Sequence, residues 1–425
     1  MADLPQSPQD KLRIAFFFGG GFDRPSPARH LEIGLLRGVL DSGADVHLIC
    51  SKLSDGDHAI PTELTNDDSF TFSVQKRKPV NPSNFVRRYI NGVVHAFNCR
   101  NYLKVLDDFD VVFVQSSPTV LWNILAIRSV NRDIPIVYNV QDVFPGSSIA
   151  SGVMKGRLLQ AIFKRLQKIA YAKSSCITVI NEDMKQKLIE EGVPEDKIEI
   201  IVNWYDEDTI REVEWGKNRF VDKYGLSENM FYVQYAGTTG YVFDYEAFLY
   251  AAQAFQGEDS IRFQLIARGS QFDLIKKIAA ERCIDNIDFL PIEPQEMVSD
   301  VYSACTVCFI PLKKGIIGNS VPSKAALLMA CGRPVVNSVD SDSYYFEEFS
   351  KNKIGISASC ENYADSVGAI KYLFDNPDER EKMGKAAKKY CMQRYTSKNN
   401  VNLYLALFSK LAGKPLEENR NGLQG

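Results

Sequence analysis

A short segment, residues 318–324, combines residue types that suit the binding of a phosphate group. It follows an apolar run at 307–312 and reads Gly318-Asn319-Ser320-Val321-Pro322-Ser323-Lys324. Pro322 favours a first helical turn, and Gly332 suits the end of that helix. Free N–H groups at a helix start near Ser323 would attract a phosphate or diphosphate. Lys324 is unfavourable in a first turn unless an anion binds there, although an ordinary helix start with a solvated lysine fits the same residues.

An acidic residue, Asp142, lies in the segment Asn139-Val140-Gln141-Asp142-Val143-Phe144-Pro145, directly after an apolar run. A carboxylate in such a loop could orient or deprotonate an acceptor hydroxyl. It could equally cap the next helix. The residue type and its position therefore leave both roles open.

Two glycine-rich loops also follow apolar runs. Gly19-Gly20-Gly21 comes early in the chain, and the helix behind it begins with Arg29, His30 and Glu32. The second loop, Gly237-Thr238-Thr239-Gly240, could receive a phosphate or a sugar. The first is not a dinucleotide fingerprint, because no G-x-G-x-x-G opens a helix there. It permits close approach of a ligand or of another domain, and a plain turn fits as well.

The elements that must position these residues alternate along the whole chain. Short β-branched or aromatic runs are separated by segments of helical periodicity, which is the pattern of parallel sheets covered by helices. The runs predict strands near residues 13–18, 45–50, 111–115, 134–139, 176–180, 198–202, 231–236, 262–267, 287–290, 307–311, 334–338 and 354–356. Two such series predict two doubly wound α/β domains, residues 1–205 and 206–398, with the boundary in the polar stretch 205–214.

In open α/β sheets, ligands bind beyond the carboxyl ends of the strands. Small and polar residues gather at these positions in both halves of the chain. They include Gly20, Gly21, Asp142, Gly237, Thr238, Arg268 and the 313–324 loop. The pattern predicts a ligand held between two facing sheets.

Length and composition favour a globular protein of two domains. The chain has 425 residues, of which 45% are hydrophobic and 24% charged, and one core normally stops growing below that length. No apolar run reaches the roughly 18 residues of a membrane span, and the N-terminus lacks a signal-peptide pattern, so a cytosolic chain is expected. The nine cysteines are scattered, mostly in apolar patterns, and reduced buried thiols fit best, including Cys305 and Cys308. No metal-ligand spacing, Ser/His/Asp triad or Walker loop is present.

Charge is distributed unevenly. Residues 71–175 hold 15 Lys or Arg and five Asp or Glu, although the whole chain has a formal net charge of −3. This excess indicates an anionic membrane or substrate, and no nucleic-acid module accompanies it. The basic and aromatic residues expected at a membrane edge are Lys76, Arg77, Lys78, Phe85, Arg87 and Arg88. A helix over 155–173 could also lie on a membrane, but the width of its apolar stripe favours packing on its own sheet.

Several segments recur in an order and spacing that identify a family. They are residues 28–32 (Ala-Arg-His-Leu-Glu), 138–145, 177–182, 192–198, 202–204, 235–237, 319–324 and 329–335. Together they resemble the retaining glycosyltransferases of family 4, which have the GT-B fold, and most closely the bacterial members that add amino sugars during O-antigen and capsule synthesis. The resemblance spans residues 12–412.

This resemblance implies two facing Rossmann-like domains, an acceptor on the first, a nucleotide sugar held mainly by the second, and a final helix near 399–412 that crosses back. The expected reaction moves a sugar from a nucleotide diphosphate donor, a UDP-sugar, to a polyprenyl-diphosphate-linked glycan at the inner face of the bacterial membrane. The protein would be peripheral there, and a protein partner in polysaccharide assembly fits the same setting. No cofactor or metal is implied.

The positions described above and the resemblance together suggest roles for individual residues. Lys324, Arg268 and the N–H groups at Ser323 would stabilise the departing diphosphate, and Asp142 would act on the acceptor. The expected substrate-binding residues are Gly20, Gly21, His30, Gly237, Thr238, Asn319, Ser320, Pro322 and Ser323.

The chain departs from the family pattern at the donor site. The family places two glutamates eight positions apart, and here Asn319 and Leu327 stand there instead. The usual arginine and lysine after the first strand of the second domain are replaced in the loop 240–244. These departures open an alternative, a degenerate glycosyltransferase that serves as a partner subunit or binds a glycan or lipid without turnover. An epimerase with this fold would need acid and base side chains that the chain lacks.

Overall fold

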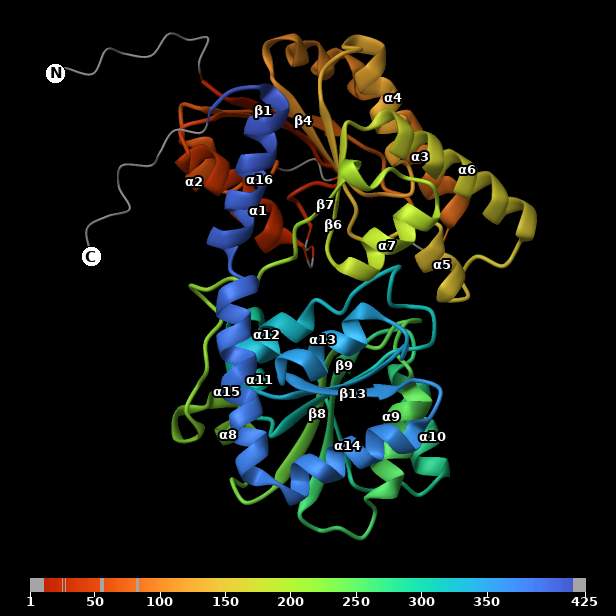
Figure 1. Ribbon diagram of the computed structural model, residues 1–425, viewed down its shortest axis with the longest axis vertical. Coiled ribbons are helices and arrows are strands. Elements are labelled where there is room, and N and C mark those ends of the chain that lie inside the picture. The colour runs from red at the N-terminus through yellow and green to blue at the C-terminus, as the bar shows by residue number, and fades with distance from the viewer. Residues whose placement is uncertain (1–10, 25, 27, 54–56, 82–83, 416–425) are drawn as a thin grey trace, which may run out of the picture.

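The computed structural model of the chain describes residues 11–24, 26, 28–53, 57–81 and 84–415. These residues form two α/β domains, one above the other in Figure 1. The first contains a seven-stranded sheet in the order β3-β2-β1-β4-β5-β6-β7, and the second a six-stranded sheet in the order β10-β9-β8-β11-β12-β13. Strand pairs within both sheets are parallel. The two predicted doubly wound domains are confirmed.

The first domain follows the expected alternation of strands and helices. Its strands are β1 Arg13–Phe17, β2 Asp45–Lys52, β3 Phe70–Lys76, β4 Val111–Gln115, β5 Ile136–Asn139, β6 Cys176–Val179 and β7 Ile198–Ile200. Its α-helices are α1 Arg29–Asp41, α2 Thr62–Thr65, α3 Phe85–Asn98, α4 Val120–Val130, α5 Gly146–Ala150, α6 Arg157–Lys173 and α7 Glu182–Glu190, and the longest 3-10 segment is Cys99–Asp108.

The second domain repeats the pattern. Its strands are β8 Phe231–Thr238, β9 Ile261–Arg268, β10 Ile287–Leu290, β11 Val307–Pro311, β12 Val335–Val339 and β13 Gly355–Ser359. Its helices are α8 Arg219–Tyr224, α9 Tyr245–Ala254, α10 Phe272–Glu281, α11 Val298–Ser303, α12 Lys324–Ala330, α13 Tyr344–Asn352, α14 Tyr363–Asp375 and α15 Pro377–Arg394, after which comes α16 Ser397–Ala412.

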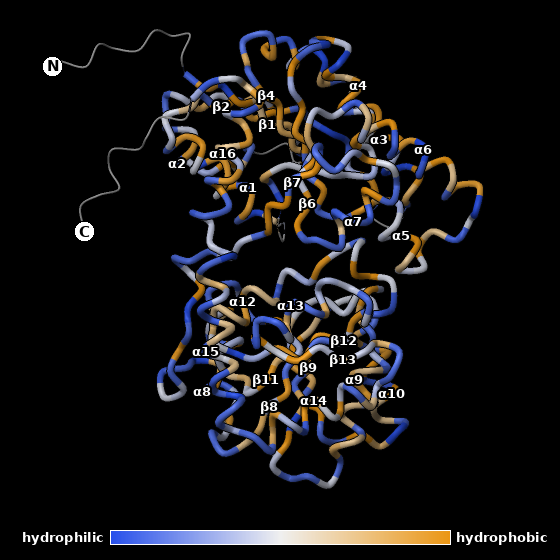
Figure 2. Tube along the Cα trace, in the orientation of Figure 1, coloured by the Kyte–Doolittle hydropathy of each residue, from blue (hydrophilic) through white to orange (hydrophobic). Residues whose placement is uncertain are grey.

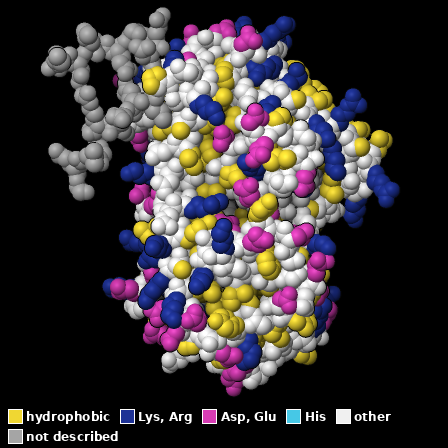
Figure 3. Space-filling model, in the orientation of Figure 1, with side chains coloured by type: hydrophobic (Ala, Val, Ile, Leu, Met, Phe, Trp, Pro, Cys, Tyr) yellow, Lys and Arg dark blue, Asp and Glu magenta, His cyan; other side chains and the backbone are white. Residues whose placement is uncertain are grey.

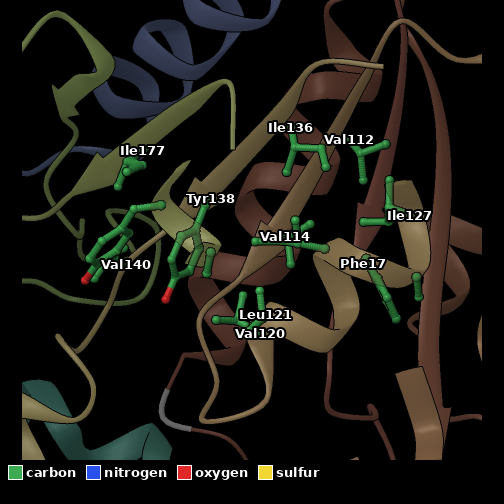
Figure 4. Packing of buried hydrophobic residues seen from close by; sticks show 14 of the residues in the cluster. Phe17, Val112, Val114, Val120, Leu121, Ile127, Ile136, Tyr138, Val140 and Ile177 are labelled. Atoms are coloured by element: carbon green, nitrogen blue, oxygen red, sulfur yellow. The ribbon is translucent and has the colours of Figure 1, made fainter. Parts of the chain in front are cut away.

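Each sheet is buried on both faces, because its central strands are apolar throughout. The strands are therefore mostly orange in Figure 2. In the close view of the first domain, Phe17, Val114 and Ile136 from the sheet meet Leu121 and Ile127 from α4 (Figure 4). All five side chains are at most 5% exposed.

Helix α16 ties the end of the chain to the first domain. It continues from α15 on the side of the second domain and lies beside α1 (Figure 1). Phe408 packs with its ring 6.2 Å from that of Phe16, and the Tyr404 hydroxyl accepts a hydrogen bond of 2.8 Å from Asn139 Nδ2. The C-terminal helix thus rests on strands β1 and β5.

Both sheets reverse their strand order at one point, between β1 and β4 in the first domain and between β8 and β11 in the second. Loops that leave neighbouring strands at such a point diverge to opposite faces, which leaves a crevice at the carboxyl end of the sheet. These two crevices hold the candidate sites. Among the described residues, no helix combines the length and the apolar character that crossing a bilayer requires.

Candidate active site

The crevice of the second domain contains a lysine whose amino group is buried. Lys324 is the first residue of α12, with Ser323 in the N-cap position, as the sequence predicted. Its Nζ lies 3.4 Å from the centre of the Tyr235 ring. Gly237 leaves the room for this contact, since a Cβ there would come within 2.7 Å of Nζ. The amino group is buried and has no hydrogen-bond partner among the described residues.

Burial changes the proton affinity of this amino group. Loss of water lowers the pKa of Lys324 to about 7, and the nearby Cys308 thiol offsets only part of the fall. The face of an aromatic ring attracts a cation but does not replace a counterion. Its protonated form is therefore a desolvated cation that an incoming anion would stabilise.

Other predicted donor-site residues surround this crevice. Thr238 ends β8 and Arg268 ends β9, side by side in the sheet register, and both are exposed. The Thr239 N–H donates to the Arg268 carbonyl at 2.9 Å, which joins the two loops. Ser323 is exposed at the start of α12, next to half-buried Pro322. The Arg268 guanidinium has no hydrogen bond or ion pair to another described residue.

Asn319 is already bound within the protein. Its Nδ2 donates to the Gly315 carbonyl at 2.8 Å, and its Oδ1 accepts a hydrogen bond from Lys187 of the first domain. Leu327 is half-buried and packs against the apolar cluster under α12. At the two positions where the family has glutamates, the side chains thus make an interdomain bridge and an apolar contact.

Asp142 lies where the two domains meet. The N–H of Val143 donates to the Asn319 carbonyl at 2.8 Å. Surrounding protein removes water from the Asp142 carboxyl and raises its pKa, and a hydrogen bond with Ser320 offsets part of that rise. The residue as a whole remains open to solvent. The structure therefore brings Asp142, Asn319 and Ser320 together, from segments that are far apart in sequence.

A second interdomain contact was not predicted from the sequence. The two carboxylate oxygens of Asp183 accept hydrogen bonds from the N–H groups of Tyr344 and Tyr345, at 2.8 and 2.9 Å. These N–H groups open α13, so Asp183 caps a helix of the other domain. Its position after the N-cap residue Asn181 of α7 resembled an ordinary first-turn acid.

The predicted acceptor-side residues lie at the crevice of the first domain. Gly20 is exposed there, and Gly21 is buried with its Cα hydrogens facing the Ser51 carbonyl. A ring nitrogen of His30, Nε2, lies 3.0 Å from the Trp204 carbonyl, which ties the start of α1 to the segment that leaves the sheet. The imidazole is therefore engaged with the backbone.

The six residues expected at a membrane edge lie in two different environments. Lys76 and Arg87 are exposed, but Arg77, Lys78, Phe85 and Arg88 line a pocket in the first domain. Membrane contact does not fit Arg77, whose guanidinium donates to the Gly19 carbonyl at 2.7 Å. It does not fit Phe85 either, because its ring packs on Phe163. The reason is that β3 ends at Lys76, and the chain then turns across the crevice.

All nine cysteines have free thiol groups, and Cys283 is the exposed one. Within the described residues, no group of three or more His, Cys, Asp or Glu side chains could hold a metal ion.

Two family models match the two halves of the chain. One, described as Glycosyltransferase Family 4, matches residues 33–209, and the other, described as Glycosyl transferases group 1, matches residues 216–390. The chain belongs to the glycosyltransferases of GT-B fold.

A curated relative agrees with this family, and solved structures share the fold. The chain is 26% identical over 228 residues to "Probable glycosyltransferase WbjE" from Pseudomonas aeruginosa. The matched region covers 53% of this chain and 56% of that relative. The fold is similar to that of sucrose-phosphate synthase from Thermosynechococcus elongatus (TM-score 0.72, 12% identity, 95% of this chain and 100% of that one). It is also similar to HepE from Anabaena in complex with UDP-glucose (TM-score 0.69, 14% identity, 94% of this chain and 100% of that one).

Proposed function

We propose that this glycosyltransferase moves a sugar from a nucleotide diphosphate sugar, a UDP-sugar, to a lipid-linked glycan, with retention of configuration, in the synthesis of a cell-surface polysaccharide. The observation that carries the proposal is the buried amino group of Lys324, which lies without a counterion at the crevice of the second domain. A donor diphosphate would supply the missing negative charge. The UDP-glucose in the HepE complex supports a nucleotide sugar as the donor.

The chemistry assigned to the site follows from charge. When the bond between sugar and diphosphate breaks, negative charge develops on the leaving oxygens. Lys324 and Arg268 would stabilise that charge, and preorganised groups of this kind contribute the most in a site shielded from water. Asp142, held against Ser320 at the meeting of the domains, would orient the acceptor hydroxyl.

A membrane-associated acceptor is supported by the surface of the first domain. Helices α3 and α6 touch through the rings of Tyr89 and Phe163, 5.1 Å apart. On their outer faces they expose Val86, Ile90, Val94, Phe97, Leu158, Leu159 and Ile162, each at least 43% exposed. Lys and Arg side chains lie among them, and Figure 3 shows both kinds on the lobe at the right. Apolar side chains ringed by cations suit the surface of an anionic bilayer.

A non-catalytic role is a second candidate, and the state of Asn319 favours it. A side chain that stands in place of a donor-binding glutamate is used to hold the two domains together. A binding protein could keep this contact permanently, whereas an enzyme must admit and release a donor.

Turnover distinguishes the two candidates. The full chain is incubated with UDP-, GDP- and dTDP-sugars and a bacterial lipid fraction as the acceptor source, and release of the nucleoside diphosphate is measured. We expect release that depends on both the lipid and one class of donor, and that is lost in Lys324→Met. The control is Lys314→Met, in the same loop, where the lysine pairs with Glu361 at the surface. Donor binding without release would instead establish the non-catalytic role.

A further inference from the structure

The crevice of the first domain opens into a pocket of about 400 Å³. Its walls are the loops after β1 and β4, the start of α3 and the segment that follows β3. It therefore occupies the point where the strand order reverses, as the Lys324 crevice does in the second domain. The N–H of Gln141 donates to Ser116 Oγ at 3.2 Å, which connects this pocket to the loop that carries Asp142.

The charged side chains that line the pocket are all basic. They are Arg24, Arg77, Lys78 and Arg88, and no Asp or Glu is among the lining residues, which all belong to the described part of the chain. Asp23 is on the same loop as Arg24, but its Oδ2 accepts a hydrogen bond from the Leu53 N–H at 2.7 Å. Burial lowers the pKa of His95, another lining residue, to about 3, so its ring is neutral.

Arg77 experiences this excess of positive charge directly. Its Nη1 donates to the Gly19 carbonyl, but its Nε is buried without a hydrogen-bond partner among the described residues. Burial lowers the pKa of Arg77, and the nearby charge of Arg24 lowers it further. Two guanidinium groups held close together are destabilising unless an anion lies between or beside them. A ligand with negative charge would therefore stabilise the guanidinium groups of Arg24 and Arg77.

The rest of the lining shows what accompanies that charge. Hydroxyl and amide groups of Ser116, Ser117, Thr119, Asn91 and Asn123 also line the pocket. Asn123 Oδ1 is buried without a partner among the described residues. The pocket thus offers cations to a phosphate and polar groups to the hydroxyls of a sugar.

We propose that this pocket binds the phosphate or diphosphate group of the acceptor. The inference rests on the proposed function, because it names the chemistry of the acceptor for the same reaction. Arginine forks match phosphate oxygens in geometry as well as in charge. Phe85 and Tyr89 line the pocket from α3, whose outer face is apolar. A prenyl diphosphate could place its head in the pocket and its chain along this helix, and a soluble sugar phosphate would use the same cations.

The test uses two probes, geranyl diphosphate and glucose 1-phosphate, in titration calorimetry at low salt. The full chain carries Lys324→Met, so that neither probe can be held by the donor crevice. Lys78→Gln and Arg88→Gln are then added together. Both side chains are exposed, so their replacement should leave the fold intact. Arg77→Gln is not used, because it could disturb the Gly19 loop. Arg87→Gln is the matched control, because Arg87 is exposed on α3 next to Arg88 but does not line the pocket.

We expect at least one probe to bind, with affinity that falls as salt is added and that drops about tenfold or more in the double variant while Arg87→Gln has no effect. Tighter binding of geranyl diphosphate identifies a lipid-linked source, and tighter binding of glucose 1-phosphate identifies a soluble one. Binding of neither probe, or equal loss in Arg87→Gln, overturns the inference. Donor turnover by the unmodified chain is measured separately, so a failure of this pocket and a failure of the proposed function give different results.

Discussion

At the scale of single residues, the donor crevice depends on an amino group that the fold does not neutralise. Lys324 Nζ lies over the Tyr235 ring and close to Gly237, and both residues belong to β8. Removing water from a cation costs free energy, and a ring face returns only part of that cost. The folded protein is therefore less stable than it would be with an apolar side chain of the same length. Binding of an anion beside Lys324 would recover part of this free energy.

The folding free energy should depend on pH through this residue. The pKa of Lys324 is about 7 in the folded protein and ordinary in the unfolded chain, so between these values the unfolded state binds more protons. Stability contributed by this site therefore rises with pH above 7, and the full cost of burying the charge applies below 7. We expect Lys324→Met to be more stable than the wild type at pH 6, by several kcal/mol, with a smaller difference at pH 9. Thermal unfolding of both proteins at the two pH values measures this, and a difference independent of pH would contradict it.

The sequence could predict part of this site and not the rest. Pro322, Ser323 and Lys324 indicate a helix start with an unexpected cation, and α12 begins there. The burial of Nζ depends on Tyr235 and on the open space above Gly237, which are some 90 residues away in sequence. Likewise, Asn319 looked like a polar residue facing a ligand, because nothing local shows that Lys187 of the other domain binds it. Contacts between domains leave no local pattern.

At the scale of elements, the two domains are held together at the start of α13, which is capped by a side chain of the first domain. The two N–H groups at the start of α13 are satisfied by Asp183 on α7. Its neighbour on the same helix, Lys187, holds Asn319. Gly146, at the start of α5, allows the close approach, since a Cβ there would come within 2.1 Å of Asn319 Oδ1. One helix of the first domain thus carries the side chains that keep the crevices facing each other.

Removal of this cap should loosen the closed arrangement. In Asp183→Ala, two N–H groups of α13 lose their acceptor, which costs about 1 kcal/mol or more of interdomain stability. We expect a larger radius of gyration by small-angle scattering and weaker donor binding. Ser343→Ala is the matched control, because Ser343 Oγ accepts the Phe346 N–H within the second domain. An unchanged radius in Asp183→Ala, or the same increase in both variants, would show that this contact does not hold the domains.

Strands and helices were predicted unequally well, for a physical reason. The central strands are continuous apolar runs and were predicted. The edge strand β3 was not, because apolar and polar residues alternate along Phe70–Lys76 and form no apolar run. For α6, packing on its own sheet was favoured over exposure to a membrane. Phe163 and Ala170 are indeed buried, but Leu158 is 77% and Ile162 47% exposed. An apolar stripe shows what could be buried, and the neighbouring elements decide how much of it is.

At the scale of the whole molecule, one side differs from the rest. The outer faces of α3 and α6 form an apolar and basic surface on the first domain, at the end that also holds the basic pocket. The second domain, with the donor crevice, is attached below it (Figure 1). A protein that rests on a membrane by α3 and α6 would keep the basic pocket close to the bilayer, while the donor crevice stays accessible from water.

The outer face of α3 can be tested by removing its apolar side chains. In Val86→Ser/Ile90→Ser/Phe97→Ser, exposed groups are replaced, so the fold should persist while binding to the bilayer interface weakens. We expect the wild type to float with anionic liposomes at low salt and the triple variant to remain at the bottom. The control is Leu274→Ser on α10 of the second domain, a position that is 45% exposed, as Phe97 is. Flotation of the triple variant to the same extent as the wild type would exclude this surface.

The most direct test of the central claim is a calorimetric titration of UDP into the wild type, Lys324→Met and Lys314→Met, at pH 6 and pH 9. The account predicts that UDP binds the wild type and Lys314→Met alike, and that affinity falls from pH 6 to pH 9, because the diphosphate binds the protonated form of an amine whose pKa in the free protein is about 7. In Lys324→Met, binding should be weaker by about a hundredfold and lose this pH dependence. Equal affinity of all three proteins for UDP, with the same dependence on pH, would contradict the assignment of Lys324 to the donor diphosphate.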